Sequence, residues 1–143
     1  MIGMIVTGHG NFATGLTSSV KLIAGMPELY EMVDFVETDT TDDLKANLNK
    51  AVDNLSGCEA IMVFSDLMGG SPFKTAVEVS MMRTENIKVL AGTNLGMLIE
   101  ISMARQFIED FDMLCDMAVN TGKDQVIKYT YVERVQEESE DGI

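Results

Sequence analysis

The chain contains a single histidine, His9, and a glycine stands on either side of it. The apolar run from Ile2 to Val6 predicts a buried strand, and the segment from Thr7 to Gly10 predicts a glycine turn at its end. Flanking glycines leave room for the reacting group of another protein to approach the imidazole. A neutral imidazole attacks best when an acceptor holds the proton on its other nitrogen. The pattern therefore predicts a nucleophilic histidine.

A second polar turn offers that acceptor. Residues Ala60 to Ser65 are nearly all apolar, which is typical of a strand in a parallel sheet, and they lead into a segment from Asp66 to Pro72 that contains two glycines. If Asp66 accepts the Nδ1 proton of His9, Nε2 becomes the reactive nitrogen. We expect Ser71 to be the N-cap of a helix whose first residue is Pro72.

A third turn, Gly92-Thr93-Asn94, follows a predicted strand over Ile87 to Ala91. Because ligands bind beyond the carboxyl ends of parallel strands, we expect the three turns to meet in one crevice. Each turn begins a helix, so free N–H groups and positive dipole ends suit an anion such as a phosphoryl group. We assign catalysis to His9 and Asp66, phosphate binding to Gly10, Gly70 and Ser71, and a place in the lining of the site to Asn11, Thr93 and Asn94.

Strands and helices alternate along the chain, which predicts an α/β fold: an open, doubly wound, mainly parallel sheet with helices on both faces. The most distinct helix follows Thr40 and Asp43, which resemble an acidic capping box. The other elements are helices around Ala13 to Ile23, Leu44 to Leu55, Phe73 to Met82, Leu98 to Ala104 and Met113 to Val119, a strand over Met32 to Val36, and a C-terminal edge strand over Val126 to Val132. This last strand could pair within the chain or be exchanged in a dimer.

Composition limits the classes of function. The 143 residues suffice for one domain, which we place at residues 1–132, and residues 133–143 hold five acids against one base, which predicts a disordered acidic tail. The net charge of -13 argues against nucleic acid as a partner and favours a protein partner with a basic or apolar patch. The N-terminus does not resemble a signal peptide, so we expect a cytoplasmic protein, with Cys58 and Cys115 as buried thiols.

These residues resemble the enzyme IIA components of the mannose class (mannose, fructose, sorbose and N-acetylgalactosamine type) of the bacterial phosphoenolpyruvate-dependent sugar phosphotransferase system. The resemblance is carried by the segments Met4 to Gly10, Asp66 to Phe73, Gly92 to Glu100 and Met103 to Arg105. Many family members have proline where this chain has Gly96.

The resemblance implies a phosphocarrier without a cofactor or metal. It would accept a phosphoryl group from HPr on His9, with Asp66 orienting the ring and Ser71 contacting the phosphate, and pass the group to a IIB component. The membrane components IIC and IID would meet it only indirectly. The resemblance also implies a homodimer in which Val126 to Val132 joins the sheet of the neighbouring chain.

Two other functions fit parts of the pattern. The segment from Gly8 to Ala13 matches a relaxed dinucleotide-binding fingerprint, which would make the chain a nucleotide-binding module. Alternatively, Asp66 could be the phosphoacceptor of a receiver-like signalling domain. That chemistry requires Mg²⁺ held by further acids after the first strand, and Thr7-Gly8-His9 contains none.

Overall fold

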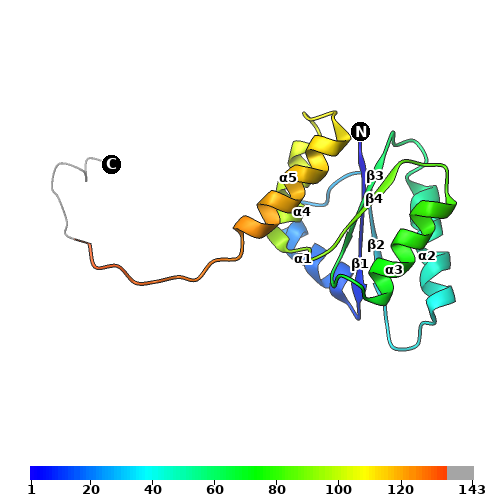
Figure 1. Ribbon diagram of the computed structural model, residues 1–143, viewed down its shortest axis with the longest axis horizontal. Helices are drawn as coiled ribbons and strands as arrows, with labels where there is room; N and C mark the ends of the chain where they lie inside the picture. The colour runs from blue at the N-terminus through cyan, green and yellow to red at the C-terminus, as the bar shows by residue number, and fades with distance from the viewer. Residues whose placement is uncertain (135–143) are drawn as a thin grey trace.

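The computed structural model describes residues 1–134, which fold around one parallel sheet (Figure 1). The elements follow in the order β1 (Gly3–His9), α1 (Phe12–Ala24), β2 (Tyr30–Phe35), α2 (Thr41–Asn54), β3 (Ile61–Ser65), α3 (Ser71–Met82), β4 (Ile87–Leu90), α4 (Leu95–Ala104) and α5 (Phe111–Asp124). The strands lie in the order β2-β1-β3-β4, and every pair is parallel. The predicted doubly wound α/β fold is therefore confirmed.

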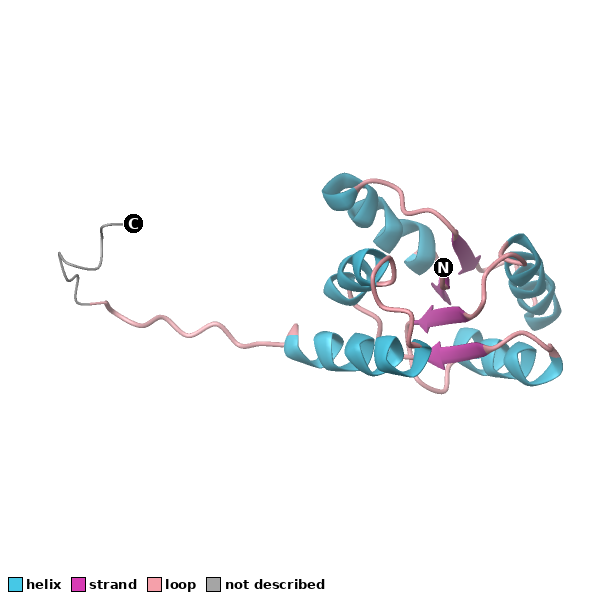
Figure 2. Ribbon diagram, turned by 90° about the horizontal axis from the view of Figure 1, so that it is seen from above, coloured by secondary structure: helices cyan, strands magenta, loops and turns pink. Residues whose placement is uncertain are grey.

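Helices cover both faces of the sheet, with α1, α4 and α5 on one side and α2 and α3 on the other (Figures 1 and 2). The alternation of side chains along β1 explains the two layers. Met4 and Val6 point into the core under α1, α4 and α5, whereas Ile5 between them points into the core under α2 and α3. A strand that is apolar on both faces can only sit at the centre of such a sandwich.

Local signals in the sequence define α2. The side chain of Thr40 accepts the N–H of Asp43 at 3.1 Å, and the Asp43 carboxylate accepts the N–H of Thr40 at 2.9 Å, so the predicted capping box is present. The predicted apolar stripe is also confirmed, since its members are all fully buried: Leu44, Leu48, Val52 and Leu55.

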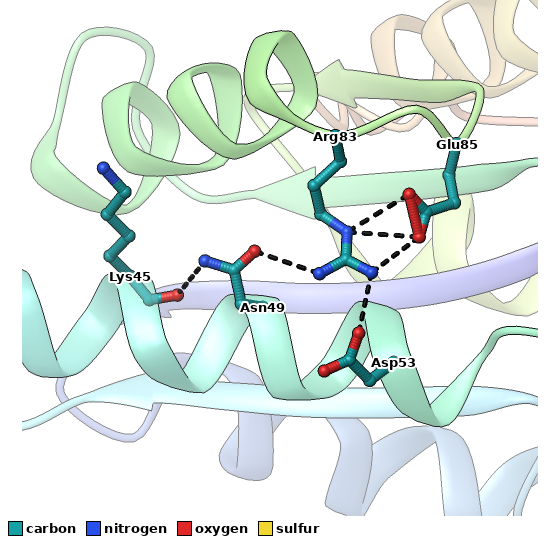
Figure 3. A network of polar contacts seen from close by, with 5 residues as sticks. All are labelled: Lys45, Asn49, Asp53, Arg83 and Glu85. Atoms are coloured by element: carbon teal, nitrogen blue, oxygen red, sulfur yellow. Dashed lines mark hydrogen bonds and ion pairs between the residues drawn. The ribbon is translucent and has the colours of Figure 1, made fainter.

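A polar network joins the outer helices α2 and α3 (Figure 3). Arg83, the residue after α3, donates to Asp53 on α2 at 2.7 Å, to Asn49 on the same helix at 3.2 Å, and to Glu85 at 2.6 Å. Arg83 lies at the far end of α3 from the turn that contains Asp66. The network fixes how α3 lies on α2, and thereby where α3 begins.

The start of α3 and the end of α5 differ from the predictions. Gly70, not Ser71, is the N-cap of α3, so Ser71 is its first residue and Pro72 its second. Helix α5 runs to Asp124 instead of ending near Thr121-Gly122, because Gly122 is buried inside it: a Cβ there would lie 2.4 Å from the sulfur of Met97. Packing thus places a glycine inside a helix, where local propensity predicts a stop.

The C-terminal segment forms no strand within the described chain. Residues Val126 to Val132 have no regular secondary structure, are exposed, and extend away from the body (Figure 1). Their pairing with a second chain stays a prediction. Of the predicted acidic tail, residues 135–143 lie outside the described residues.

Cys115 is buried as predicted, but Cys58 is only half-buried, and both thiols are free. Burial raises the pKa of Cys115 to about 11, so it is largely protonated at neutral pH. Among the described residues, no helix is both long and apolar enough to cross a membrane.

Candidate functional site

The candidate site lies at the carboxyl ends of β1 and β3, the two central strands. The chain leaves β1 towards β2 on one side and leaves β3 towards β4 on the other, so the strand order reverses between these two strands. This reversal is where open α/β sheets bind ligands, because the connecting helices diverge there. His9 is the last residue of β1, and Asp66 follows the last residue of β3.

The two side chains meet. Nδ1 of His9 lies 2.8 Å from Oδ2 of Asp66, and the same oxygen accepts the backbone N–H of His9 at 2.9 Å. The other carboxylate oxygen, Oδ1, accepts the N–H of Leu67 at 2.7 Å. Asp66 therefore holds both the backbone and the ring of His9. The contact with Nδ1 was predicted, and the bond to the backbone N–H was not.

These contacts decide the protonation state of the pair. Burial by itself pushes the pKa of Asp66 upwards, but the hydrogen bonds from the N–H and ring of His9 and from the N–H of Leu67 outweigh it, so this pKa lies below its ordinary value. Asp66 is thus an anion that can only accept. The proton shared with Nδ1 must therefore belong to the imidazole, and Nε2 carries the lone pair in the neutral ring.

The side chain of His9 is partly open to solvent, and Gly70 borders its Nε2 side. The His9 side chain is 48% exposed, compared with 15% for Asp66. Gly70 lies directly against this side: a Cβ on it would stand 2.8 Å from Cε1 and 3.5 Å from Nε2 of His9. Because Gly70 lacks a side chain, the ring can rest on the backbone immediately before α3.

The start of α3 has the features of an anion site. Gly70 caps the helix without a side-chain hydrogen bond, and Pro72 has no N–H, so the N–H groups of Ser71 and Phe73 are available at its positive end. Of the predicted phosphate-binding residues, Gly70 lies against Cε1 and Nε2 of the ring, and Ser71 is the next residue in the chain. Gly10 follows His9 with φ +59°, a conformation that favours glycine.

The third predicted turn borders the site but does not reach the imidazole. The N–H of Gly92 donates to the carbonyl of Asp66 at 2.8 Å, and the N–H of Thr93 donates to the carbonyl of Ser65 at 3.2 Å. Asn94 caps α4 by accepting the N–H of Met97, and its amide donates to the carbonyl of Gly122. This turn therefore holds the backbone of Ser65 and Asp66 in place through hydrogen bonds to their carbonyls.

The remaining predicted lining residues differ from each other in exposure. Asn11 is exposed and is the N-cap of α1, without a side-chain capping bond. Thr93 is 8% exposed, and its hydroxyl has no hydrogen-bond partner among the described residues.

Sequence reasoning missed Phe35. This last residue of β2 lies opposite His9 in the register, and its ring meets the imidazole at 6.1 Å between centroids with an angle of 62° between the planes. The only signal was an aromatic residue near the end of a predicted strand, and nothing local shows that β2 lies beside β1.

Among the described residues, no group of three or more His, Cys, Asp or Glu side chains could hold a metal ion.

This fold and site define a family of phosphotransferase-system IIA components. The family model described as "PTS system fructose IIA component" (EIIA-man) matches residues 3–119, which include every candidate site residue, and the chain belongs to this family.

Named relatives agree with this assignment. The "PTS system mannose-specific EIIAB component" of Escherichia coli K12 is 31% identical over 125 residues, which cover 87% of this chain but 38% of that protein. The chain thus spans less than half the length of this relative. The solved structure of a phosphotransferase system component EIIA from Streptococcus agalactiae is 34% identical, covers 90% of this chain and 97% of its own, and has a TM-score of 0.83. A mannose/sorbose-specific IIA subunit from Enterococcus faecalis has the same TM-score at 24% identity, over 93% of this chain and 98% of its own, and shows the fold alone.

Proposed function

We propose that the chain is a cytoplasmic phosphocarrier of a sugar-uptake phosphotransferase system. It accepts a phosphoryl group from phosphorylated HPr on Nε2 of His9 and transfers it to a IIB component. The observation that carries this proposal is the 2.8 Å contact between Nδ1 and Asp66, which leaves the lone pair of the neutral ring on Nε2 in a side chain that is 48% exposed.

The reaction balances without a cofactor. The lone pair of Nε2 forms the new N–P bond while the N–P bond in HPr breaks, and its electron pair returns to the imidazole of HPr. The proton on Nδ1 stays in place, so the phosphorylated ring of His9 gains positive charge. The Asp66 anion stabilises that charge, and the same steps in reverse direction deliver the group to IIB.

The start of α3 supports the oxygens of the transferred group. A loose phosphoryl-transfer transition state needs positioning and charge stabilisation more than covalent help. The N–H groups of Ser71 and Phe73 and the hydroxyl of Ser71 can supply both. The N–H groups of Gly10 and Gly70 already donate to the carbonyls of Phe35 and Leu67, so these glycines would contribute by leaving space for the phosphoryl group. Of these residues, Gly70 lies against the ring of His9, and Ser71 follows it as the first residue of α3.

The surface around His9 suits a protein partner. Leu67 and Met68, in the turn after Asp66, are 63% and 78% exposed, and Val36 after β2 is 36% exposed. With a net charge of -13, this chain favours a partner that surrounds an apolar centre with basic residues. IIC and IID would receive the phosphoryl group only indirectly.

We further propose a homodimer. Val126, Ile127, Tyr129, Tyr131 and Val132 are each at least 70% exposed. β4 is an edge strand of the described sheet. An exposed apolar segment that extends from the body, together with an open strand edge on a second copy, favours strand addition.

Two alternatives fit the geometry less well. As a receiver-type phosphoacceptor, Asp66 would need a free carboxylate, but both of its oxygens already accept backbone N–H groups. For dinucleotide binding, the backbone at Gly8 would have to approach a pyrophosphate closely. Gly8 instead lies against Phe12, since a Cβ there would stand 2.5 Å from that ring.

The proposed function is tested by phosphorylation. Wild type and His9→Ala are incubated with phosphoenolpyruvate, enzyme I and HPr, and the modified residue is identified by mass spectrometry at alkaline pH. We expect phosphate on His9 in the wild type and none on the variant, whose melting temperature should match that of the wild type. Phosphate that persists on His9→Ala, or that is lost in alkali as an acyl phosphate would be, contradicts the proposal.

A further inference from the structure

Phe35 lies at a position where it can control the imidazole. It pairs with His9 across β1 and β2, and its carbonyl accepts the N–H of Gly10 at 2.7 Å, so the backbone on both sides of the histidine is held against β2. Its own ring is half-buried and packs against the core under α2 and α3. Phe35 is therefore a fixed surface, not a mobile neighbour.

Asp66, Gly70 and Phe35 lie against different parts of the imidazole. Asp66 holds Nδ1, the backbone at Gly70 lies against Cε1, and the Phe35 ring meets the imidazole edge to face at 6.1 Å. A hydrogen bond to one nitrogen does not stop the ring from swinging about the Cα–Cβ and Cβ–Cγ bonds, because the side chain is 48% exposed. Packing against a fixed aromatic ring restricts that motion, since aromatic pairs prefer this crossed arrangement.

We propose that Phe35 is a positioning residue: its aromatic ring keeps Nδ1 of His9 on Asp66 and Nε2 directed outwards, ready for attack. The kinetic part of this inference rests on the proposed phosphocarrier function, whereas the effect on the imidazole does not. Phe35 acts through His9 and needs no contact with the phosphoryl group.

The chain offers a clear spectroscopic test, because its only histidine gives one imidazole signal. Phe35→Leu keeps an apolar side chain but removes the aromatic ring, and Phe35→Tyr restores it. Phe111→Leu is the matched control: Phe111 is also half-buried, but it begins α5 and packs in the other core cluster. Each variant is compared by its ¹⁵N imidazole spectrum and by single-turnover phosphoryl transfer from phosphorylated HPr.

We expect Phe35→Leu to shift the ¹⁵N signals towards a mixture of Nδ1-H and Nε2-H tautomers and to lower the maximal transfer rate about 3- to 10-fold, the size of a typical aromatic pair. The half-saturating HPr concentration should change less than about twofold, since the orientation of the imidazole affects the phosphoryl-transfer step more than the binding of HPr. Phe35→Tyr should restore both readouts, and Phe111→Leu should leave both unchanged even if it melts earlier.

Two results would overturn the inference: a Phe35→Leu spectrum and rate that match those of Phe111→Leu, or a failure of Phe35→Tyr to restore them. If the wild type accepts no phosphate from HPr, the phosphocarrier proposal fails, but the tautomer spectrum still tests the role of Phe35.

Discussion

At each end of the sheet, a charged side chain forms hydrogen bonds with backbone groups. The two ends differ in whether a side-chain nitrogen there is left without a hydrogen bond. At the amino end, Arg105 is 4% exposed, and its guanidinium donates to the carbonyls of Ile2, Leu29, Glu28 and Ser102. At the carboxyl end, the bonded pair of His9 and Asp66 leaves Nε2 free. A buried group that uses its hydrogen bonds on backbone stabilises the fold, whereas a half-exposed group with one free nitrogen can react.

This comparison predicts that changes at the amino end reduce stability and that changes at the carboxyl end reduce reactivity. Single substitutions at each end of the sheet test this separation.

Arg105→Met should lower the free energy of unfolding by about 3 kcal/mol, because the carbonyls of Ile2, Glu28 and Leu29 each lose a hydrogen bond from a charged donor. Urea unfolding measures this loss. The free energy of unfolding of Arg105→Lys should lie between those of the wild type and Arg105→Met, since an ammonium group cannot reach the same set of carbonyls. Phosphorylation per folded molecule should stay within about twofold of the wild type. Unchanged stability of Arg105→Met would refute the structural role of the amino end.

Asp66→Asn should slow phosphoryl transfer about 100-fold, because the amide no longer stabilises the positive ring that forms when Nε2 is phosphorylated. Rapid-quench transfer from phosphorylated HPr measures this effect. The matched control is Asp34→Asn, which removes the same charge from another strand-end carboxylate that bonds Thr14 and not the histidine. Equal rates for the two variants would show that net charge, not ring orientation, matters here.

Gly70→Ala should slow transfer about tenfold, because its Cβ would lie 2.8 Å from Cε1 of His9 and push the ring from its place. The backbone itself tolerates alanine, since Gly70 has φ -71°. Gly57→Ala is the control, because a Cβ there meets nothing within 4 Å. A normal rate for Gly70→Ala would mean that the ring has more room than this contact implies.

The contrast between the two ends also separates what the sequence could and could not predict. The pairing of His9 with Asp66 followed from two glycine-containing turns after apolar strands, because parallel strands bring their carboxyl ends to one edge. The capping box of α2 is equally local. Such features depend on residues close in sequence or on the general rules of a parallel sheet.

Features that depend on long-range packing were missed. Nothing near Phe35 in the sequence shows that its ring will touch a residue on a neighbouring strand. Nothing near Arg105 shows that it will bind the carbonyl of Ile2, just before β1, and that of Leu29, just before β2. Gly122 by itself predicts the end of a helix, and only its packing against Met97 explains why the helix continues past it. In each case the partner is distant in sequence, and only the assembled fold defines it.

The smallest expected effect is the acid dependence of stability, and it distinguishes the two ends without any phosphate donor. The hydrogen bonds from His9 and Leu67 outweigh burial and hold the pKa of Asp66 below its ordinary value of 3.8, so its stabilisation is complete above that value and is lost as the pH falls through the lowered pKa. The difference in unfolding free energy between wild type and Asp66→Asn, about 1 kcal/mol at about pH 5, should therefore become smaller at about pH 2. Arg105 stays charged over this whole range, so the larger difference for Arg105→Met should stay constant. Urea unfolding at both pH values measures both differences, and a constant difference for Asp66→Asn would mean that its hydrogen bonds in the folded chain do not favour the carboxylate.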